Sequence, residues 1–409
     1  MNNGTQQRGW FLRIHRRAAG AALGLAIVIA PSVVASRSVE AQTFTLLYSF
    51  TGGTDGRTPL GGVILDAAGN LYGTTSQGGN LACSLGCGTV FKVERAGNET
   101  VLYSFAGTGA GDGEYPNAAL VRDAAGTLYG TTVGGGASGY GTVFKLDTTG
   151  KETVLHSFSG ATGDGASPYG GVVRDGQGNL YGTTEAGGTS NYGTVFKLDT
   201  TGKETVLYSF TGTGGDGKSP FAGVVRDGQG NLYGTTQAGG VLNYGTVFKL
   251  DTTGKETVLY SFAGTGGDGA QPMSGLARDA NGNLYGTTNS GGTGIEGGNG
   301  VVFKLDNTGR ERVLYHFPWT GAKGIHPHGV VRDTQGNLYG TTVFQGASGW
   351  GTVFKLAPTG KLTVLYNFTG SNADGGDPYA GVARDGQGNL YGTTSAGALG
   401  YGTVFKITP

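Results

Sequence analysis

A short motif that recurs at a nearly constant interval constrains this chain more than any other feature. One copy, Asn-Leu-Tyr-Gly-Thr-Thr, occupies residues 179–184. The Leu-Tyr-Gly cores begin at Leu71, Leu128, Leu180, Leu232, Leu284, Leu338 and Leu390. These seven copies lie 57, 52, 52, 52, 54 and 52 residues apart. A period near 50 residues is typical of propellers, solenoids and other arrays of stacked units.

Each repeat contains four short runs that favour β-strands. In residues 171–210 we expect strands at 171–175, 179–184, 193–199 and 204–210, because these runs are β-branched or aromatic and are bounded by Gly, Asp or Asn. No helical periodicity appears after residue 41. Four antiparallel strands repeated seven times predict an all-β fold, a seven-bladed β-propeller.

The two ends of the repeat region predict how the ring closes. The last copy stops after its third strand, at residues 402–406, whereas residues 43–50 form a fourth strand with no preceding three. We therefore expect the N-terminal strand to complete the last blade, which removes the exposed edges of an open array. An open β-solenoid is the alternative.

Residues 1–41 have the features of an export signal. Arg8, Arg13, Arg16 and Arg17 form a basic head, and residues 18–30 form an apolar run of 13 residues. This run is shorter than the roughly 20 residues that span a bilayer. We expect cleavage after Ala41, or alternatively after Ala35; a retained membrane anchor is the other possibility. The propeller then occupies residues 42–409.

Composition and charge exclude several classes of partner. The chain has 28 basic and 28 acidic residues; residues 1–41 hold five Arg and one Glu, so 23 basic and 27 acidic residues remain, a net charge of −4. This balance argues against nucleic acid and anionic membrane surfaces as partners. Glycine accounts for 85 of 409 residues, but the aromatic content of 10% argues against disorder.

The two cysteines, Cys83 and Cys87, lie in one loop. In an exported protein they are expected to form a disulfide, which would stabilise the fold by about 2 kcal/mol at most because the closed loop is short. A metal site would need more ligands, and none are near in sequence.

Loop lengths differ between the two ends of the repeat. The turns between the first and second strands, and between the third and fourth, have constant lengths. The other two loops vary: the loop between the second and third strands has 12 residues at 76–87 and 11 at 289–299, against eight at 185–192. Both variable loops should emerge on one face of the ring. That face is either a binding surface or simply less tightly packed.

An aromatic residue precedes the third strand in five copies. These residues are Tyr140, Tyr192, Tyr244, Trp350 and Tyr401. They should lie at the rim of the variable face, where flat amphipathic rings could stack on sugars or hold a partner protein. Local packing over the end of the blade is the alternative. His326 and His328 form the only histidine pair and are weak candidates for metal ligands, since no third ligand is identifiable.

Two charged motifs also recur. Arg-Asp pairs end the first strand, at Arg122-Asp123, Arg174-Asp175, Arg226-Asp227, Arg278-Asp279, Arg332-Asp333 and Arg384-Asp385. We expect each Arg to pair with a neighbouring Asp and each Asp to cap its turn. Asp-Gly-x-x-Pro recurs in the loop before the first strand, at Asp55, Asp112, Asp164, Asp216, Asp268 and Asp374, with Lys323 in the sixth copy. An Asp-stabilised turn stiffened by Pro is expected there.

Three further recurring units carry a resemblance to a known family. Gly-Asn-Leu-Tyr-Gly-Thr-Thr, Tyr-Gly-Thr-Val-Phe-Lys-Leu and Thr-Val-Leu-Tyr-Ser-Phe follow one another in fixed order through nearly all of residues 43–409. Together they resemble the GloVer tandem repeat of choice-of-anchor bacterial surface proteins. The resemblance implies export, a propeller-like fold and display outside the cytoplasm. It implies no activity and no catalytic residues. Because the chain stops at residues 407–409, directly after a strand, we expect a freely secreted or periplasmic protein rather than an anchored one.

The sequence therefore predicts an exported, non-catalytic and monomeric propeller that binds a glycan or a surface protein on its variable face. It predicts no nucleic-acid partner, no stable membrane insertion after signal cleavage and no cofactor, because no nucleophile elbow, zinc-protease pair or phosphate loop occurs. One alternative is a hydrolase or lyase with a metal at the channel mouth, held by His326, His328 and a loop Asp such as Asp268. Another is a structural protein of the cell envelope.

Overall fold

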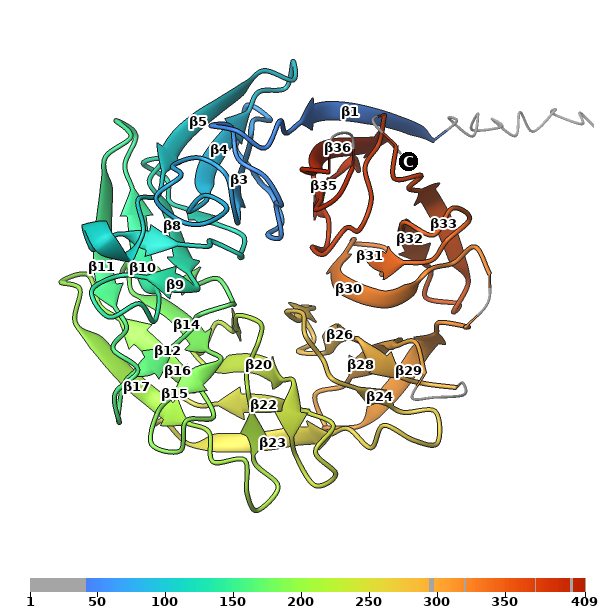
Figure 1. Cartoon of the computed structure of the whole chain (residues 1–409). Coiled ribbons are helices and arrows are strands. Elements are labelled where there is room, and N and C mark those ends of the chain that lie inside the picture. The colour runs from blue at the N-terminus through green and yellow to red at the C-terminus, as the bar shows by residue number, and fades with distance from the viewer. Residues whose placement is uncertain (1–41, 294–297, 320, 372, 398–399, 409) are drawn as a thin grey trace, which may run out of the picture. The chain divides into compact units, whose positions relative to one another are not determined.

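Short β-branched and aromatic runs separated by glycine turns fold into sheets of four antiparallel strands. The computed structural model describes residues 42–293, 298–319, 321–371, 373–397 and 400–408. In these residues seven four-stranded sheets follow one another along the chain, and they form a seven-bladed β-propeller (Figure 1). The predicted fold class and blade number are confirmed.

The blades are numbered here in chain order, and each starts with its innermost strand. Blade 1 comprises β2 (Ile64–Leu65), β3 (Leu71–Thr75), β4 (Thr89–Val93) and β5 (Glu99–Ser104); blade 2, β7 (Val121–Arg122), β8 (Leu128–Thr132), β10 (Thr142–Leu146) and β11 (Glu152–Ser157); blade 3, β13 (Val173–Arg174), β14 (Leu180–Thr184), β16 (Thr194–Leu198) and β17 (Glu204–Ser209); blade 4, β19 (Val225–Arg226), β20 (Leu232–Thr236), β22 (Thr246–Leu250) and β23 (Glu256–Ser261). Blade 5 comprises β25 (Ala277–Arg278), β26 (Leu284–Thr288), β28 (Val301–Leu305) and β29 (Glu311–His316); blade 6, β30 (Ile325–Arg332), β31 (Leu338–Phe344), β32 (Thr352–Leu356) and β33 (Leu362–Asn367); blade 7, β34 (Ala383–Arg384), β35 (Leu390–Thr394), β36 (Thr403–Thr408) and β1 (Thr43–Ser49).

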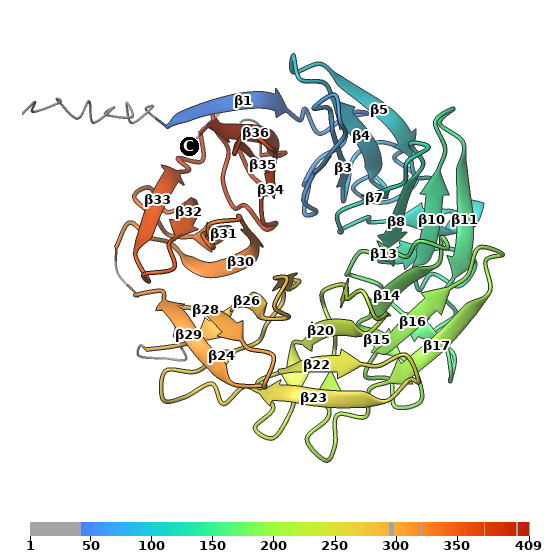
Figure 2. The ribbon, with the colours of Figure 1, turned by 180° about the vertical axis from the view of Figure 1, so that it is seen from behind.

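The N-terminal strand closes the ring. Strand β1 pairs antiparallel with β36, from Thr43 opposite Thr408 to Ser49 opposite Thr403. In Figure 1 the blue β1 lies beside the red β36, and Figure 2 shows the same arrangement from behind. A hydrogen bond of 2.9 Å from the Thr393 hydroxyl to the Gly61 carbonyl also joins blade 7 to blade 1. The predicted closure is confirmed.

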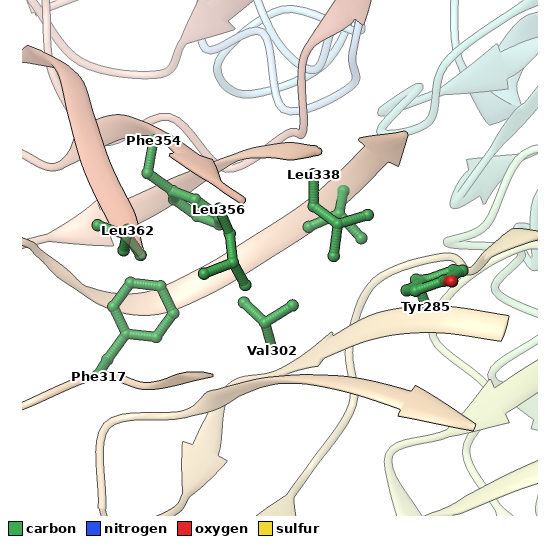
Figure 3. Packing of buried hydrophobic residues seen from close by; sticks show 8 residues of the cluster. Tyr285, Val302, Phe317, Leu338, Phe354, Leu356 and Leu362 are labelled. Atoms are coloured by element: carbon green, nitrogen blue, oxygen red, sulfur yellow. The ribbon is translucent and has the colours of Figure 1, made fainter. Parts of the chain in front are cut away.

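The hydrophobic core lies between neighbouring blades. Phe196 on β16 is fully buried and meets Phe158, which follows the outer strand of blade 2, edge to face at 5.2 Å. Figure 3 shows the equivalent packing of blades 5 and 6, where Phe317 lies against Leu362 and the other side chains of one cluster. A Cβ at Gly182 would lie 2.7 Å from the ring of Phe196, so the glycine of the Leu-Tyr-Gly motif makes room for this ring.

The turns of constant length are held by buried or half-buried carboxylates. The Asp175 side chain accepts hydrogen bonds from the backbone of Gln177 and Asn179, from the Asn179 amide and from the Tyr181 hydroxyl. All seven blades have this hydrogen bond from the tyrosine hydroxyl to the carboxylate, at 3.0–3.2 Å. The turn therefore has the same length in every blade because its Asp fixes it to the second strand. The predicted capping role is confirmed.

The predicted pairing of each repeat Arg with a neighbouring Asp is wrong. In the described residues the two salt bridges are Lys92–Glu94 and His156–Asp164, and neither involves these arginines. Each guanidinium instead lies over the tyrosine ring of the preceding blade, as Arg226 does over Tyr181 at 5.7 Å. Each Asp carboxylate already accepts hydrogen bonds from its own turn. The guanidinium therefore makes a cation–π contact with the tyrosine ring beside that carboxylate.

Short additional sheets tie the variable loops together. The loop between blades pairs with the loop between the second and third strands of the same blade. These pairs are β6 (Gly113–Glu114) with β9 (Gly134–Gly135), β12 (Gly165–Ala166) with β15 (Ala186–Gly187), β18 (Gly217–Lys218) with β21 (Ala238–Gly239), and β24 (Gly269–Ala270) with β27 (Ser290–Gly291). In blade 6 the same pairing lengthens β30 and β31. Both variable loops therefore lie on one face, called the variable face below.

The predicted signal peptide at residues 1–41 lies outside the described residues and stays a prediction. The described part of the chain has one 3-10 helix, η1 (Thr108–Ala110), and no helix there is long and apolar enough to cross a membrane.

Candidate binding site at the propeller axis

The Asp-Gly-x-x-Pro loop is anchored by its carboxylate. In the loop entering blade 4, Asp216 accepts hydrogen bonds from the Tyr208 hydroxyl at 3.1 Å, from the Thr211 backbone at 2.7 Å and from the Gly217 backbone at 2.7 Å. The carboxylate thus ties the loop to the outer strand of the blade before it, in addition to forming the predicted turn. In the sixth copy Lys323 replaces the Asp, and its ammonium lies over the Tyr315 ring.

The residue before the proline adopts a left-handed backbone in every copy. The seven residues are Thr58, Tyr115, Ser167, Ser219, Gln271, His326 and Asp377, with φ between 53° and 60°. None is glycine, so each costs on the order of 1 kcal/mol of strain. The backbone N–H of Ser219 bonds to the Tyr192 carbonyl of the preceding blade at 2.9 Å, and the other six make the equivalent bond. This interblade bond holds the strained loop and places the proline and the next residue near the axis.

The residue after the proline lines a cavity at the centre of the variable face. The seven blades contribute Leu60, Asn117, Tyr169, Phe221, Met273, His328 and Tyr379. Gly, Ala or Ser residues follow each of them and line the same cavity, which has a volume of about 720 Å³. We call it the axial cavity. Its small residues are in backbone contact: a Cβ at Gly170 would lie 2.2 Å from the backbone nitrogen of Gly223.

Aromatic side chains form two groups on the wall of the axial cavity. The rings of Tyr169 and Phe221 are stacked, with centroids 4.3 Å apart and planes inclined by 19°. On blades 6 and 7, Tyr379 meets His328 edge to face at 6.0 Å and Phe344 edge to face at 6.2 Å. The cavity therefore offers flat apolar surfaces from blades 3 and 4 and from blades 6 and 7.

The axial cavity carries no formal charge at neutral pH. Its lining contains no Asp, Glu, Lys or Arg among the described residues. Burial lowers the pKa of His328 to about 4, so this imidazole is neutral at pH 7. The Oδ1 atom of Asn117 is buried and has no hydrogen-bond partner among the described residues. Asn117 as a whole is half-buried and lines the cavity, so it offers a polar amide beside the aromatic surfaces.

The five predicted rim aromatics lie apart from this cavity, one at each of five blade boundaries. Each ring lies against a glycine of the next interblade loop: a Cβ at Gly52 would lie 2.7 Å from the ring of Tyr401. Tyr140, Tyr192, Tyr244 and Trp350 remain 39–47% exposed. No ring contact joins any two of the five in the described residues, so the structure does not gather them into one site. Their role in ligand binding stays a prediction.

The two histidines point to different places. His328 lines the axial cavity, whereas the Nδ1 atom of His326 lies 3.1 Å from Asn289 Oδ1. Among the described residues neither belongs to a group of three His, Cys, Asp or Glu side chains close enough to hold a metal. The third ligand of the enzyme hypothesis, Asp268, instead accepts hydrogen bonds from the Tyr260 hydroxyl and the Ala263 backbone.

The predicted disulfide between Cys83 and Cys87 is confirmed, with an S–S distance of 2.01 Å. It lies over Gly107, where the rim aromatic of other copies would lie. The Glu114 carboxylate is 2.9 Å from Cys83 Sγ. The disulfide therefore replaces an aromatic ring at this blade boundary.

Sequence analysis missed the seven residues of the axial cavity. A signal was present: they occupy one fixed position after the proline, and they differ in nearly every copy although the residues around them repeat. Their direction toward the axis depends on the left-handed residue before the proline, which residue type alone does not reveal.

Comparisons with known proteins agree with this fold. The model of the Gloeobacter/Verrucomicrobia repeat matches residues 32–228, 85–297 and 293–409. No curated protein sequence matches the chain. Among solved structures, it is similar to the extracellular domain of a protein of B. thetaiotaomicron described as the hybrid two component system BT3049, with 15% identity and a TM-score of 0.58, covering 90% of this chain and 41% of that one. It is also similar to the extracellular domain of the one component system BT4673 of B. thetaiotaomicron, with 11% identity and a TM-score of 0.54, covering 89% and 40%. This chain thus spans about two fifths of each, and the likeness shows the fold alone.

Proposed function

The chain belongs to the Gloeobacter/Verrucomicrobia repeat family, and from this premise we propose that it is an exported binding scaffold that holds a neutral glycan in the axial cavity. Export is supported by the disulfide and by the extracellular domains among its structural neighbours. A ring that places loops from seven blades around one cavity is a suitable scaffold for recognition.

One observation carries the proposal. Seven equivalent positions around the axis hold six different residue types, and together they line an uncharged cavity with aromatic walls. Sugar rings have apolar faces that stack on aromatic side chains and hydroxyl edges that bond to amides and carbonyls. The stacked pair Tyr169 and Phe221 offers the first kind of contact, and Asn117 and Ser274 offer the second. An anionic ligand would find no cationic partner in this lining.

A glycan array and a pull-down from the surface of the parent cells would test the proposal with the exported protein. We expect binding to neutral oligosaccharides and weak or absent binding to sulfated and sialylated ones. Phe221→Ala should weaken this binding about tenfold or more, because a stacked ring is lost. Trp350→Ala, on the rim, serves as the matched control and should retain affinity. Blank results in both assays, or unchanged affinity in Phe221→Ala, would contradict the proposal.

A further inference from the structure

The interfaces between blades, called seams here, are closed on the variable face by a repeated contact. At five seams the aromatic residue before the third strand covers a glycine of the next interblade loop. The pairs are Tyr401 with Gly52, Tyr140 with Gly160, Tyr192 with Gly212, Tyr244 with Gly264, and Trp350 with Gly370. At the seam between blades 1 and 2 the disulfide covers Gly107 in the same way.

The seam between blades 5 and 6, called seam 5–6, lacks this contact. Asn299 stands where the other copies have the aromatic residue or Cys87, and it is only 1% exposed. Trp319 stands where the others have glycine, and it is 60% exposed. At this seam the bulky ring is therefore on the interblade loop instead of before the third strand, and no aromatic ring covers the loop.

A second repeated contact is also missing at seam 5–6. At the other six seams the first Thr of the Thr-Thr pair donates a hydrogen bond to a carbonyl of the next blade, as Thr183 does to Ala222 at 2.8 Å. In blade 5 the Thr287 hydroxyl instead lies 2.6 Å from the Ser274 hydroxyl of its own blade. A Cβ at Gly275 would meet no heavy atom within 4 Å. Near the axis seam 5–6 therefore lacks this hydrogen bond, although the strands of blades 5 and 6 still pack in one hydrophobic cluster.

A groove of about 810 Å³ occupies this region. Its lining includes Tyr244, Gln271, Asn289, Ser290, Trp319 and His326. Asn289 lines both this groove and the axial cavity, so the two spaces are neighbours. Amide, hydroxyl and imidazole groups line the groove between the two aromatic residues, with Ser290 Oγ 3.1 Å from Gln271 Oε1. No Asp, Glu, Lys or Arg lines it among the described residues.

We propose that this groove extends the axial cavity and holds the outer sugars of a neutral oligosaccharide, so that the ligand is a chain rather than a single sugar. The inference rests on the proposed function and adds the length of the ligand and its direction of exit, across seam 5–6. The chemistry of the two spaces supports one continuous ligand. In the described part of the chain neither lining contains a charged side chain, and both combine aromatic surface with uncharged polar groups.

Restoring the repeated contact at this seam tests the inference. The double variant Asn299→Tyr, Trp319→Gly gives seam 5–6 the residues that Tyr244 and Gly264 already use one seam earlier. With a glycan selected on the array, wild type should bind the hexasaccharide about tenfold more tightly than the disaccharide. The double variant should bind both with the affinity that wild type has for the disaccharide. Tyr140→Ala, at a seam away from the groove, should leave the preference for the longer chain unchanged.

Three results would overturn the inference. They are equal wild-type affinity for the two lengths, an unchanged preference in the double variant, and displacement of the hexasaccharide from the groove by an extended peptide but not by longer glycans. In all three the disaccharide can still bind and Phe221→Ala can still weaken it, so the proposed function would survive. If the double variant does not give the wild-type circular dichroism spectrum, Trp319→Ala replaces it. That single change should reduce only the affinity for the longer chain.

Discussion

The interior of the blades and the mouth of the axial cavity are built from the same repeat, yet they differ in how strictly the repeat is kept. All seven third strands place a fully buried Phe at one position: Phe91, Phe144, Phe196, Phe248, Phe303, Phe354 and Phe405. The position after the interblade proline instead holds Leu, Asn, Tyr, Phe, Met, His and Tyr. Every seam has the same shape to fill, because the blades are alike, so the residues that pack there repeat. The cavity is shared by all blades, so each blade can contribute a different side chain.

Alanine substitutions at two phenylalanines should distinguish these two regions most clearly. Phe196→Ala removes a fully buried ring between blades 2 and 3 and should lower the free energy of unfolding by about 3–5 kcal/mol. Phe221→Ala removes a partly exposed ring at the axial cavity and should cost about 1 kcal/mol. Urea unfolding followed by circular dichroism measures both changes. Similar losses in the two variants would mean that the cavity mouth is as much a packing element as the seams.

The disulfide should contribute to stability without contributing to recognition. Replacing both cysteines, Cys83→Ala and Cys87→Ala, should lower the free energy of unfolding by about 2 kcal/mol at most, because the loop that the bond closes is short. Neither cysteine lines the axial cavity, so glycan affinity should not change. Denaturant unfolding of this variant, beside wild type treated with a reductant, measures the effect. A loss of affinity in a folded double variant would connect this loop to the site.

The seams also contain carboxyl groups that should make stability depend on pH. Burial, and secondarily the nearby Asp216 carboxylate, raises the pKa of Glu256 from 4.5 to about 7, and its Oε1 atom is buried without a partner among the described residues. Equivalent glutamates occur at Glu99, Glu152, Glu204 and Glu311, each with its pKa raised to about 7. A raised pKa means that folding takes up protons between these two values. The contribution of these glutamates to stability is therefore highest below pH 4.5, falls as pH rises toward 7, and is constant above that.

Glu256→Gln removes one of these groups. The variant should be more stable than wild type by about 1 kcal/mol at pH 8, a value reduced for solvent screening, and the difference should vanish near pH 4. Thermal unfolding across this pH range measures it. Glu94→Gln is the control, because Lys92 lowers the pKa of that exposed carboxyl and no gain at pH 8 is expected. Parallel pH profiles for wild type and Glu256→Gln would contradict the account.

In blade 6 an uncharged residue, Leu362, already occupies the position that Glu256 has in blade 4.

The smallest effect is expected at the arginines that lie over tyrosine rings. Arg226 is exposed and reaches across a seam to Tyr181, so Arg226→Gln should cost about 0.5–1 kcal/mol. Lys218→Gln, which removes a cation over the ring of Tyr192, offers a comparison on the variable face. Denaturant unfolding at low and high salt checks both. A loss above about 2 kcal/mol for Arg226→Gln would show that this contact joins the blades more strongly than a surface cation–π pair does.

The blades can be predicted from the sequence because the interactions that form them lie within one repeat. Alternating strand residues, turn glycines and capping carboxylates all act within one repeat, and the spare strand at residues 43–50 predicted the closure. Contacts between repeats were harder to predict. The position of Arg226 depends on a ring in the preceding blade, and that of Tyr192 on a glycine in the following loop. A single repeat contains neither partner.

The axial cavity could not be predicted for a related reason. Its side chains reach the axis because residues such as Ser219 and Gln271 adopt a left-handed backbone, although their side chains do not favour it. The interblade hydrogen bond that holds this conformation exists only once two neighbouring blades have packed together. The loop lengths predict the variable face, but they do not distinguish its rim, where each aromatic ring lies against a glycine, from the cavity at its centre.

A crystal structure of the protein with the selected oligosaccharide bound would test the central claim most directly, since it locates the ligand. The account predicts sugar rings in the axial cavity against Tyr169 and Phe221, with a hydrogen bond to the Asn117 amide group. A ligand bound on the rim aromatics, or on the face of the constant turns, with the axial cavity holding only solvent, would contradict it.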